Sequence, residues 1–259
     1  MVGGDRRCDV NTDAVPETRA DGRADDELRP VSFTLDVAPA SAGSVLVALG
    51  RTRVICAVSL ENAVPRWMRM QQVAGGWLTA EYAMLPYATE ARTSRASSLG
   101  RIGGRAHEIQ RMIGRALRAV TDLAALGPRT LWVDCDVLEA DGGTRTAAVT
   151  GAWVALRLAT RRLLRDGTLG SDPVRGAVAA VSVGRVGGRA RLDLCYAEDA
   201  SAEVDLNVAM TDTGNLIEVQ GAAERAAFSR TELEAMLDLA ERGVARLTAA
   251  QARALADAS

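Results

Sequence analysis

The sequence predicts an α+β protein, in which short strands and long helices form mixed layers around one core. Strand-like segments occur as hairpins between three long helical patterns, without the regular β–α–β alternation of a doubly wound sheet. Of the 259 residues, 48% are hydrophobic, which is enough for a substantial core and excludes a disordered chain. We expect one compact domain over residues 28–259.

Alternation of apolar and polar residues predicts the first strand, which begins at Val31. The turn at residues 50–52 separates two further apolar runs and predicts a hairpin. Residues 68–76 are predicted to form an exposed loop, and the strand that follows stops at Pro86. The strands expected in this part of the chain are 31–37, 43–49, 53–60 and 77–85.

Apolar residues recur at helical spacing in three segments, which we predict as helices over 109–123, 145–164 and 231–255. Gly127 and Pro128 are expected to end the first of them. A tight turn at residues 141–143 precedes the second. The remaining apolar runs predict strands at 129–138, 178–186, 190–196, 204–211 and 216–220.

Charge and residue types exclude several kinds of chemistry. All 31 basic residues are arginine, so a P-loop lysine and a Schiff-base lysine are excluded. His107 is the single histidine, which excludes zinc sites built on paired histidines. The four cysteines (Cys8, Cys56, Cys135 and Cys195) are widely separated, and we expect neither a disulfide nor a cysteine-rich metal site. A net charge of −2 argues against bulk attraction to nucleic acid but permits a local arginine patch.

The chain is expected to be cytoplasmic and to have no membrane partner. No run of about 18 apolar residues predicts a transmembrane helix. Residues 1–27 are polar and charged, lack the apolar stretch of a secretory signal, and are predicted to form a flexible N-terminal leader.

The first candidate site is the pentapeptide Asp141-Gly142-Gly143-Thr144-Arg145, between a predicted strand and a predicted helix. Glycines allow close approach of a ligand, and free amides at a helix start favour an anion. Arg145 opposes the helix dipole unless an anion binds there, and with the Thr144 hydroxyl it could clamp phosphate. The alternative is an ordinary turn in which Asp141 caps the helix.

The second candidate is Gly103-Gly104-Arg105, which also enters a predicted helix and where Arg105 again opposes the dipole. Arg92 and Arg95 lie in or beside the preceding loop and make this part of the chain locally cationic. The alternative is a solvated helix face, which we favour for the later arginines of the segment, Arg111, Arg115 and Arg118.

The third candidate is acidic and comprises Asp199 and Asp205, with Glu198 and Glu203 nearby. Asp205 lies on the polar face of a predicted strand, so the two aspartates could converge as oxygen ligands for Mg²⁺. The alternative is a solvent-facing strand edge. Two arginine anion sites and a carboxylate pair together describe a phosphoryl-transfer centre that needs no covalent nucleophile.

Several longer motifs follow one another in an order that resembles ribonuclease PH. From about Arg19 to the end, the chain carries ADGR (20–23), LRPV (28–31), GWLTAEY (76–82), GGR (103–105), VDCDVL (133–138), DGGTRT (141–146) and EVQG (218–221). The resemblance implies a fold like ribosomal protein S5 domain 2 and a hexameric ring built as a trimer of dimers. It also implies that inorganic phosphate, as co-substrate, attacks the 3′-terminal phosphodiester of RNA, typically a tRNA precursor, and releases a nucleoside diphosphate, with nucleotide addition as the reverse reaction.

The resemblance also implies roles for single residues. Arg105, Gly143, Thr144 and Arg145 correspond to its phosphate site, and Asp199 and Asp205 to its Mg²⁺-linked carboxylates. Asp205 is in addition a candidate acid for the departing 3′ oxygen. For RNA binding we expect Arg92, Arg95 and Tyr87, whose ring would stack on a base.

Two departures from the family pattern leave alternatives open. Tyr87 stands where an arginine is usual, and Glu90 adds a negative charge to the same loop. One alternative is therefore a diverged phosphorolytic or nucleotidyl-transferring enzyme that acts on short RNA or a small nucleotide. The other is a non-catalytic RNA-binding subunit of a ring.

Overall fold

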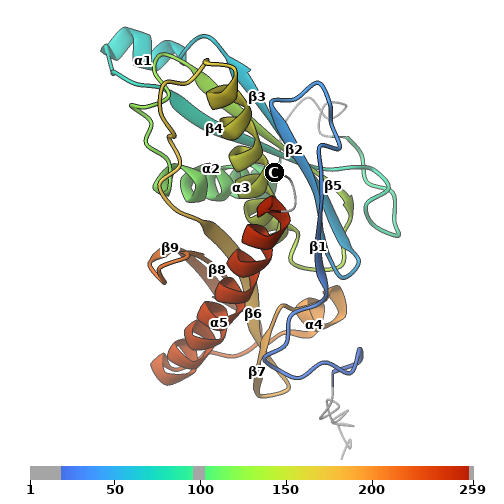
Figure 1. Cartoon of the computed structure of the whole chain (residues 1–259). Coiled ribbons are helices and arrows are strands. Elements are labelled where there is room, and N and C mark those ends of the chain that lie inside the picture. The colour runs from blue at the N-terminus through green and yellow to red at the C-terminus, as the bar shows by residue number, and fades with distance from the viewer. Residues whose placement is uncertain (1–18, 96–102, 257–259) are drawn as a thin grey trace, which may run out of the picture.

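The structure is a computed structural model, and it describes residues 19–95 and 103–256. Two sheets form its framework (Figure 1). The first contains, in spatial order, β1 (Val31–Leu35), β2 (Gly43–Leu49), β3 (Thr52–Glu61), β5 (Thr130–Glu139) and β4 (Trp77–Met84). The second contains β7 (Arg189–Leu192), β6 (Val178–Val186), β8 (Val204–Thr211) and β9 (Leu216–Ala223). The helices are α1 (Arg66–Gln71), α2 (Gly104–Ala119), α3 (Thr144–Arg165), α4 (Tyr196–Ser201) and α5 (Arg230–Ala256).

Helix α3 joins the two sheets into one core. It packs against β2 and β3 of the first sheet and against β6 of the second, and most of its residues are buried. The contact is close: a Cβ atom on Gly43 of β2 would lie 2.4 Å from the backbone nitrogen of Ala159. A helix that is apolar on all sides belongs in an interior, so the alanine-rich sequence of α3 explains its central position.

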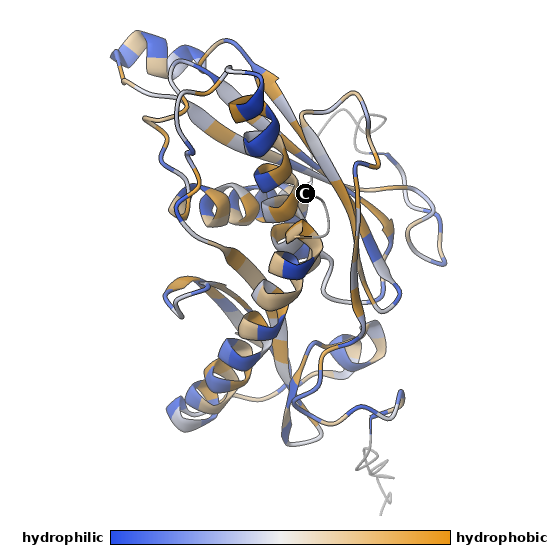
Figure 2. Ribbon diagram, viewed as in Figure 1, coloured by the Kyte–Doolittle hydropathy of each residue, from blue (hydrophilic) through white to orange (hydrophobic). Residues whose placement is uncertain are grey.

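Helix α2 packs beside α3 on the buried face of the first sheet, and α5 covers the second sheet. Helix α2 lies against β4, and α5 lies against β6 and β7. Helix α5 carries both hydrophobic and hydrophilic residues (Figure 2), and its buried residues recur every three or four positions from Met236 to Leu247, as expected for a helix with one face on a sheet. Buried residues from both sheets form one continuous hydrophobic cluster, which confirms the prediction of mixed α/β layers around one core.

All the predicted strands and long helices are present, with boundary shifts. One pairing was not anticipated: β4 pairs with β5 in parallel, so that α2 is a crossover connection between them. Helix α2 also ends earlier than predicted, at Ala119, where the Thr121 hydroxyl donates to the Leu117 carbonyl.

Two local predictions were wrong. Residues 68–76 do not form only a loop, because α1 begins after Pro65 and its Met68 side chain is buried at 2% exposure. The segment 190–196 is not all strand: β7 ends at Leu192, because Asp193 takes a left-handed conformation with φ 54°. Cys195 then caps the short helix α4, while Cys56 and Cys135 are buried free thiols in strands as expected. Cys8 lies outside the described residues.

The segment before residue 28 also differs from expectation over residues 19–27. Arg19 is only 3% exposed, and its guanidinium donates to both carboxylate oxygens of Glu198 and to the Leu192 carbonyl. Long-range contacts hold this part of the chain, so the prediction of a flexible leader does not hold for it; residues 1–18 lie outside the described part. Within the described residues, no helix is both long and apolar enough to cross a membrane.

Candidate active site

Most of the predicted site residues meet in one cavity. It has a volume of about 790 Å³ and lies where the end of β5, the start of α3, helix α4 and strand β8 come together. Its lining includes residues from all three candidate sites, Arg105, Gly143, Thr144, Arg145, Asp199 and Asp205, together with Tyr87. Segments more than 100 residues apart in the sequence therefore contribute to a single centre.

Residues 141–143, which we call the phosphate loop, present the start of α3 to the cavity. Gly142 and Gly143 both have positive φ, 75° and 67°. A Cβ atom on Gly142 would lie 2.6 Å from the Leu194 carbonyl oxygen, so a side chain does not fit there. Gly143 is the N-cap of α3 and has no side-chain cap, which leaves the first amides of the helix available to an anion.

Asp141 is not the helix cap that the alternative required. Its Oδ1 instead accepts a hydrogen bond from the backbone nitrogen of Tyr196 at 3.3 Å, which ties the phosphate loop to α4. The neighbouring Thr144 is buried and its hydroxyl shares a 2.8 Å hydrogen bond with the Tyr82 hydroxyl. Burial raises the pKa of Tyr82, so this phenol stays neutral beside the site.

Arg145 is oriented by an amide rather than neutralised by a carboxylate. Its Nη1 donates to Oε1 of Gln220 at 2.9 Å, and Nε2 of Gln220 donates in turn to Glu108 on α2. Neither Arg145 nor Arg105 forms an ion pair with a carboxylate in the described part of the chain, whereas Arg19, Arg29 and Arg157 do. Both guanidinium charges are therefore available for an anionic ligand.

The two aspartates approach the same cavity from α4 and β8. Strand β8 lies between β6 and β9, so Asp205 is half-buried on an internal strand and not at the solvent-facing edge of the alternative. Oδ2 of Asp205 accepts a hydrogen bond from Nδ2 of Asn207 at 3.1 Å, while its Oδ1 is buried without a partner among the described residues. An unsatisfied buried carboxylate oxygen indicates a ligand or a proton.

Electrostatics set these carboxylates apart from ordinary surface aspartates. Burial, followed by the charge of Asp199, raises the pKa of Asp205, and Arg145 partly offsets the rise. Burial also raises the pKa of Asp199, which the charges of Arg105 and Arg145 oppose. Two acidic groups with raised pKa beside two free arginines are typical of a centre for phosphate chemistry.

The donor set fits a cation that keeps part of its water shell. Within the described residues, no group of three or more His, Cys, Asp or Glu side chains is arranged to hold a metal. The carboxylates of Asp199 and Asp205, the latter with an unpaired Oδ1, suit Mg²⁺. This ion commonly binds through one or two carboxylates together with water and substrate phosphates.

The predicted RNA-binding residues are only partly brought to the cavity. Tyr87 lines it and is 65% exposed, so its ring is free to contact a ligand. Arg92 and Arg95 are exposed but do not line the cavity. Burial raises the pKa of Asp136 on β5 and the charge of Arg95 lowers it, which indicates that Arg95 lies beside the first sheet.

Sequence reasoning missed several residues of the site. The sequence predicts a strand at Tyr196, but this residue lies at the start of α4, where it lines the cavity and is 65% exposed. Arg29 and Thr52 hold the phosphate loop from behind, through contacts to its backbone. A side chain that contacts only the backbone of another segment requires no particular residue spacing in the sequence. The motif at residues 28–31, which contains Arg29, was therefore the one feature of the sequence that could have indicated this residue.

Two family models match most of the chain. The model described as "3′ exoribonuclease family, domain 1" matches residues 27–161, and "3′ exoribonuclease family, domain 2" matches residues 176–243. The chain belongs to the 3′ exoribonuclease family. Curated relatives of this family member include Ribonuclease PH of Nocardia farcinica, 56% identical over 92% of each chain. Ribonuclease PH of Bacillus subtilis is 52% identical over 92% of this chain and 97% of its own length.

Solved structures support the fold of this 3′ exoribonuclease family member. A chain of the Archaeoglobus fulgidus exosome with RNA bound to the active site has a TM-score of 0.77 at 23% identity, covering 90% of this chain and 92% of its own. Rice (Oryza sativa) Rrp46 has a TM-score of 0.72 at 20% identity, covering 92% and 100%. The expected fold, like ribosomal protein S5 domain 2, is confirmed.

Proposed function

We propose that this chain is a phosphate-dependent 3′-to-5′ exoribonuclease that removes 3′-terminal nucleotides of tRNA precursors as nucleoside diphosphates and runs nucleotide addition in reverse. The observation that carries the proposal is the cavity in which Gly143–Arg145 and the pair Asp199 and Asp205 face one ligand-sized space. Curated ribonuclease PH relatives at 52–57% identity over at least 92% of the chain support the same activity.

Inorganic phosphate would bind at the start of α3. The free amides after Gly143 and the guanidinium groups of Arg145 and Arg105 offer donors and positive charge to its oxygens. Held in this way, a phosphate oxygen attacks the phosphorus of the terminal phosphodiester. The new P–O bond forms as the bond from phosphorus to the 3′ oxygen of the preceding nucleotide breaks, so no covalent enzyme intermediate is needed.

Asp205 is the candidate acid for the departing 3′ oxygen. Its raised pKa means that it holds a proton more readily than an ordinary aspartate does, and the protonated form can deliver that proton to the oxygen as the bond breaks. Asp199 and the ionised form of Asp205 are the residues that would hold Mg²⁺. When bound, the cation supplies charge neutralisation at the phosphates.

RNA would approach past the exposed Tyr87, whose ring can stack on a base near the 3′ end. Arg92 and Arg95, outside the cavity, would contact the RNA backbone further along the strand. We extend the proposal to a hexameric ring, a trimer of dimers, and to a cytoplasmic location. The mass of the particle in light scattering tests the stoichiometry.

The test is incubation with a 3′-extended tRNA, with and without phosphate and Mg²⁺, and identification of the released nucleotides. Nucleoside diphosphates that appear only with phosphate support phosphorolysis. Nucleoside monophosphates formed without phosphate would instead indicate hydrolysis, and release of no nucleotide by the folded protein would contradict the proposed activity.

A second candidate is phosphorolysis of short RNA, and the placement of Arg92 and Arg95 outside the cavity favours it. Comparable kcat/KM for a dinucleotide and a long RNA would support this alternative, whereas a strong preference for long RNA would exclude it. Arg145→Ala separates both enzymes from a non-catalytic RNA-binding subunit of a ring. Under both enzyme hypotheses the substitution removes phosphate-dependent turnover. A non-catalytic subunit has no such turnover, and the variant would still bind RNA.

A further inference from the structure

Arg29 connects the two halves of the candidate active site. We propose that Arg29 is a positioning residue that sets the separation between the phosphate loop (141–143) and the acidic segment (193–199), which ends on Asp199. The inference rests on the proposed function, because it assigns a role in placing phosphate against the carboxylate pair. Arg29 itself does not line the cavity.

One side of the Arg29 guanidinium holds the phosphate loop through its backbone. Nη1 donates to the Asp141 carbonyl at 2.6 Å, and Nη2 donates to the Gly142 carbonyl at 3.4 Å. These carbonyls directly precede Gly143, the N-cap of α3. A shift of Arg29 would therefore move the amides that face the phosphate.

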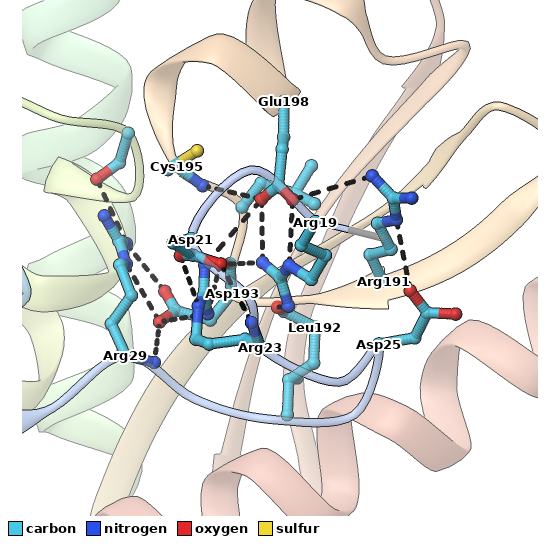
Figure 3. Close-up of polar contacts among 12 residues, drawn as sticks. Arg19, Asp21, Arg23, Asp25, Arg29, Arg191, Leu192, Asp193, Cys195 and Glu198 are labelled. Carbon is cyan, nitrogen blue, oxygen red and sulfur yellow. Dashed lines mark hydrogen bonds and ion pairs between the residues drawn. The ribbon is translucent and has the colours of Figure 1, made fainter. Parts of the chain in front are cut away.

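The other side holds Asp193. Nε donates to Oδ2 at 3.0 Å and Nη2 to Oδ1 at 2.6 Å, and the backbone nitrogen of Arg29 donates to Oδ2 at 2.8 Å (Figure 3). Both side chains are almost fully buried. A forked, bidentate contact of this kind fixes orientation as well as distance.

Asp193 is the point where the chain turns from β7 toward α4. Its left-handed φ of 54° is unusual for a residue with a side chain and persists only where surrounding contacts hold it. The two chain segments also touch directly, since the Cβ position of Gly142 is blocked by the carbonyl of Leu194. The placement of Asp199, six residues after Asp193, thus depends on the same contact that holds the phosphate loop.

Arg29 is itself held in place. A Cβ atom on Gly50 would lie 2.8 Å from Cδ of Arg29, so the arginine stem packs closely on the β2–β3 turn. Thr52 provides a second anchor for the loop: its hydroxyl donates to the Gly142 carbonyl at 2.7 Å and accepts from the Asp141 nitrogen at 3.0 Å. The N-terminal segment and β3 therefore hold the phosphate loop together.

The test is Arg29→Lys, because lysine keeps the charge beside Asp193 but cannot also reach both loop carbonyls. We expect the phosphate KM to rise at least about 5-fold and kcat to fall about 10- to 100-fold, the scale of a displacement near 1 Å. The KM for RNA should change less than about 2-fold, since the RNA-holding residues are untouched. Phosphate should also protect the variant less against thermal unfolding than it protects the wild type.

The matched control is Arg157→Lys, which changes an arginine paired with Asp172 away from this cavity. It should lower stability without altering the phosphate KM. Thr52→Val, of nearly the same shape, serves if Arg29→Lys does not fold, and it should raise the phosphate KM in the same direction.

The outcomes separate this inference from the proposed function. A wild type without phosphate-dependent diphosphate release would overturn the proposed function first. An active wild type, with folded Arg29→Lys or Thr52→Val showing an unchanged phosphate KM and unchanged phosphate protection, would overturn the positioning role. A fall in kcat that only matches a smaller folded fraction would also overturn it, because a purely structural residue has that effect.

Discussion

Burial and then the negative charge of Asp199 raise the pKa of Asp205, so the two carboxyl groups titrate as neighbours across one cavity. Burial raises the pKa of Asp199 as well, and the positive charges of Arg105 and Arg145 oppose that rise. The two environments differ in their charged neighbours: the negative charge of Asp199 acts on Asp205, whereas two arginines act on Asp199, and such a difference suits different roles.

Asp199→Asn should move the pH dependence of activity. An acid must be protonated to act, so kcat falls as the pH rises through the pKa of Asp205. Removing the Asp199 charge lowers that pKa, and the falling limb of the pH–kcat profile should shift to lower pH. Glu224→Gln is the graded control, since Glu224 raises the same pKa less. An unchanged limb in Asp199→Asn would exclude Asp205 as the titrating acid.

Asp205→Asn should lower the activity and raise the stability of the protein. The folded-state pKa is raised above the ordinary value of 3.8, so between these two values the folded protein binds more protons than the unfolded chain. The free energy of unfolding therefore falls as pH rises through this window, and the loss is complete above the folded-state pKa. At pH 7 the variant should unfold a few degrees higher than the wild type, while kcat falls about 10²–10⁴-fold as for a lost general acid.

The matched control for that variant is Asp172→Asn, for which the expected change in stability has the opposite sign. Burial raises the pKa of Asp172, but hydrogen bonds from Arg157 and the Val174 backbone outweigh it and lower the pKa. Removing this charge should lower the Tm at pH 7 and leave kcat unchanged. A lower Tm in Asp205→Asn would contradict the assignment of a raised pKa.

Arg145→Ala should reduce phosphate-dependent turnover about 10²–10³-fold, the usual effect of losing one donor to developing charge. The phosphate KM should rise as well, because Arg145 forms no ion pair within the described chain that would otherwise occupy it. Steady-state kinetics with varied phosphate measure both. Arg165→Ala, at the exposed far end of the same helix, is the control and should retain full activity.

Tyr87→Ala should raise the KM for RNA about 5- to 150-fold, which corresponds to a stacking contribution of about 1–3 kcal/mol. Tyr87→Phe keeps the ring and should stay within about 2-fold of the wild type. The phosphate KM should not change in either variant. Equal losses in Tyr87→Ala and Tyr87→Phe would show that the hydroxyl, rather than stacking, is what binds.

Gly142→Ala should destabilise the protein by about 1–3 kcal/mol, because alanine at a positive φ is strained. Its methyl group would also collide with the Leu194 carbonyl 2.6 Å away. Urea unfolding at equilibrium measures the loss. Gly170→Ala is the matched control, since no heavy atom lies within 4 Å of its Cβ position, and it should change the free energy of unfolding by less than about 0.5 kcal/mol. Similar losses in both variants would contradict the role given to the close approach.

The predictions that succeeded depend on short-range patterns. Helix α3 and strands β2 and β3 follow from spacing within a few residues, as does the glycine turn before Thr144. The errors at α1 and α4 arose where tertiary contacts override local preference. Met68 is buried by the rest of the fold, and Asp193 is held in an unusual backbone conformation by Arg29.

The sequence by itself determined the mixed α/β class, the absence of lysine chemistry and the residue types of an anion site with a carboxylate pair, because each depends on composition or local order. The tertiary structure decided that Arg145 and Asp205 share one cavity, that Arg92 and Arg95 lie outside it, and that Arg29 spans its two supporting segments. Such contacts join residues more than 100 positions apart through backbone carbonyls and buried charges, for which no periodicity in the sequence exists.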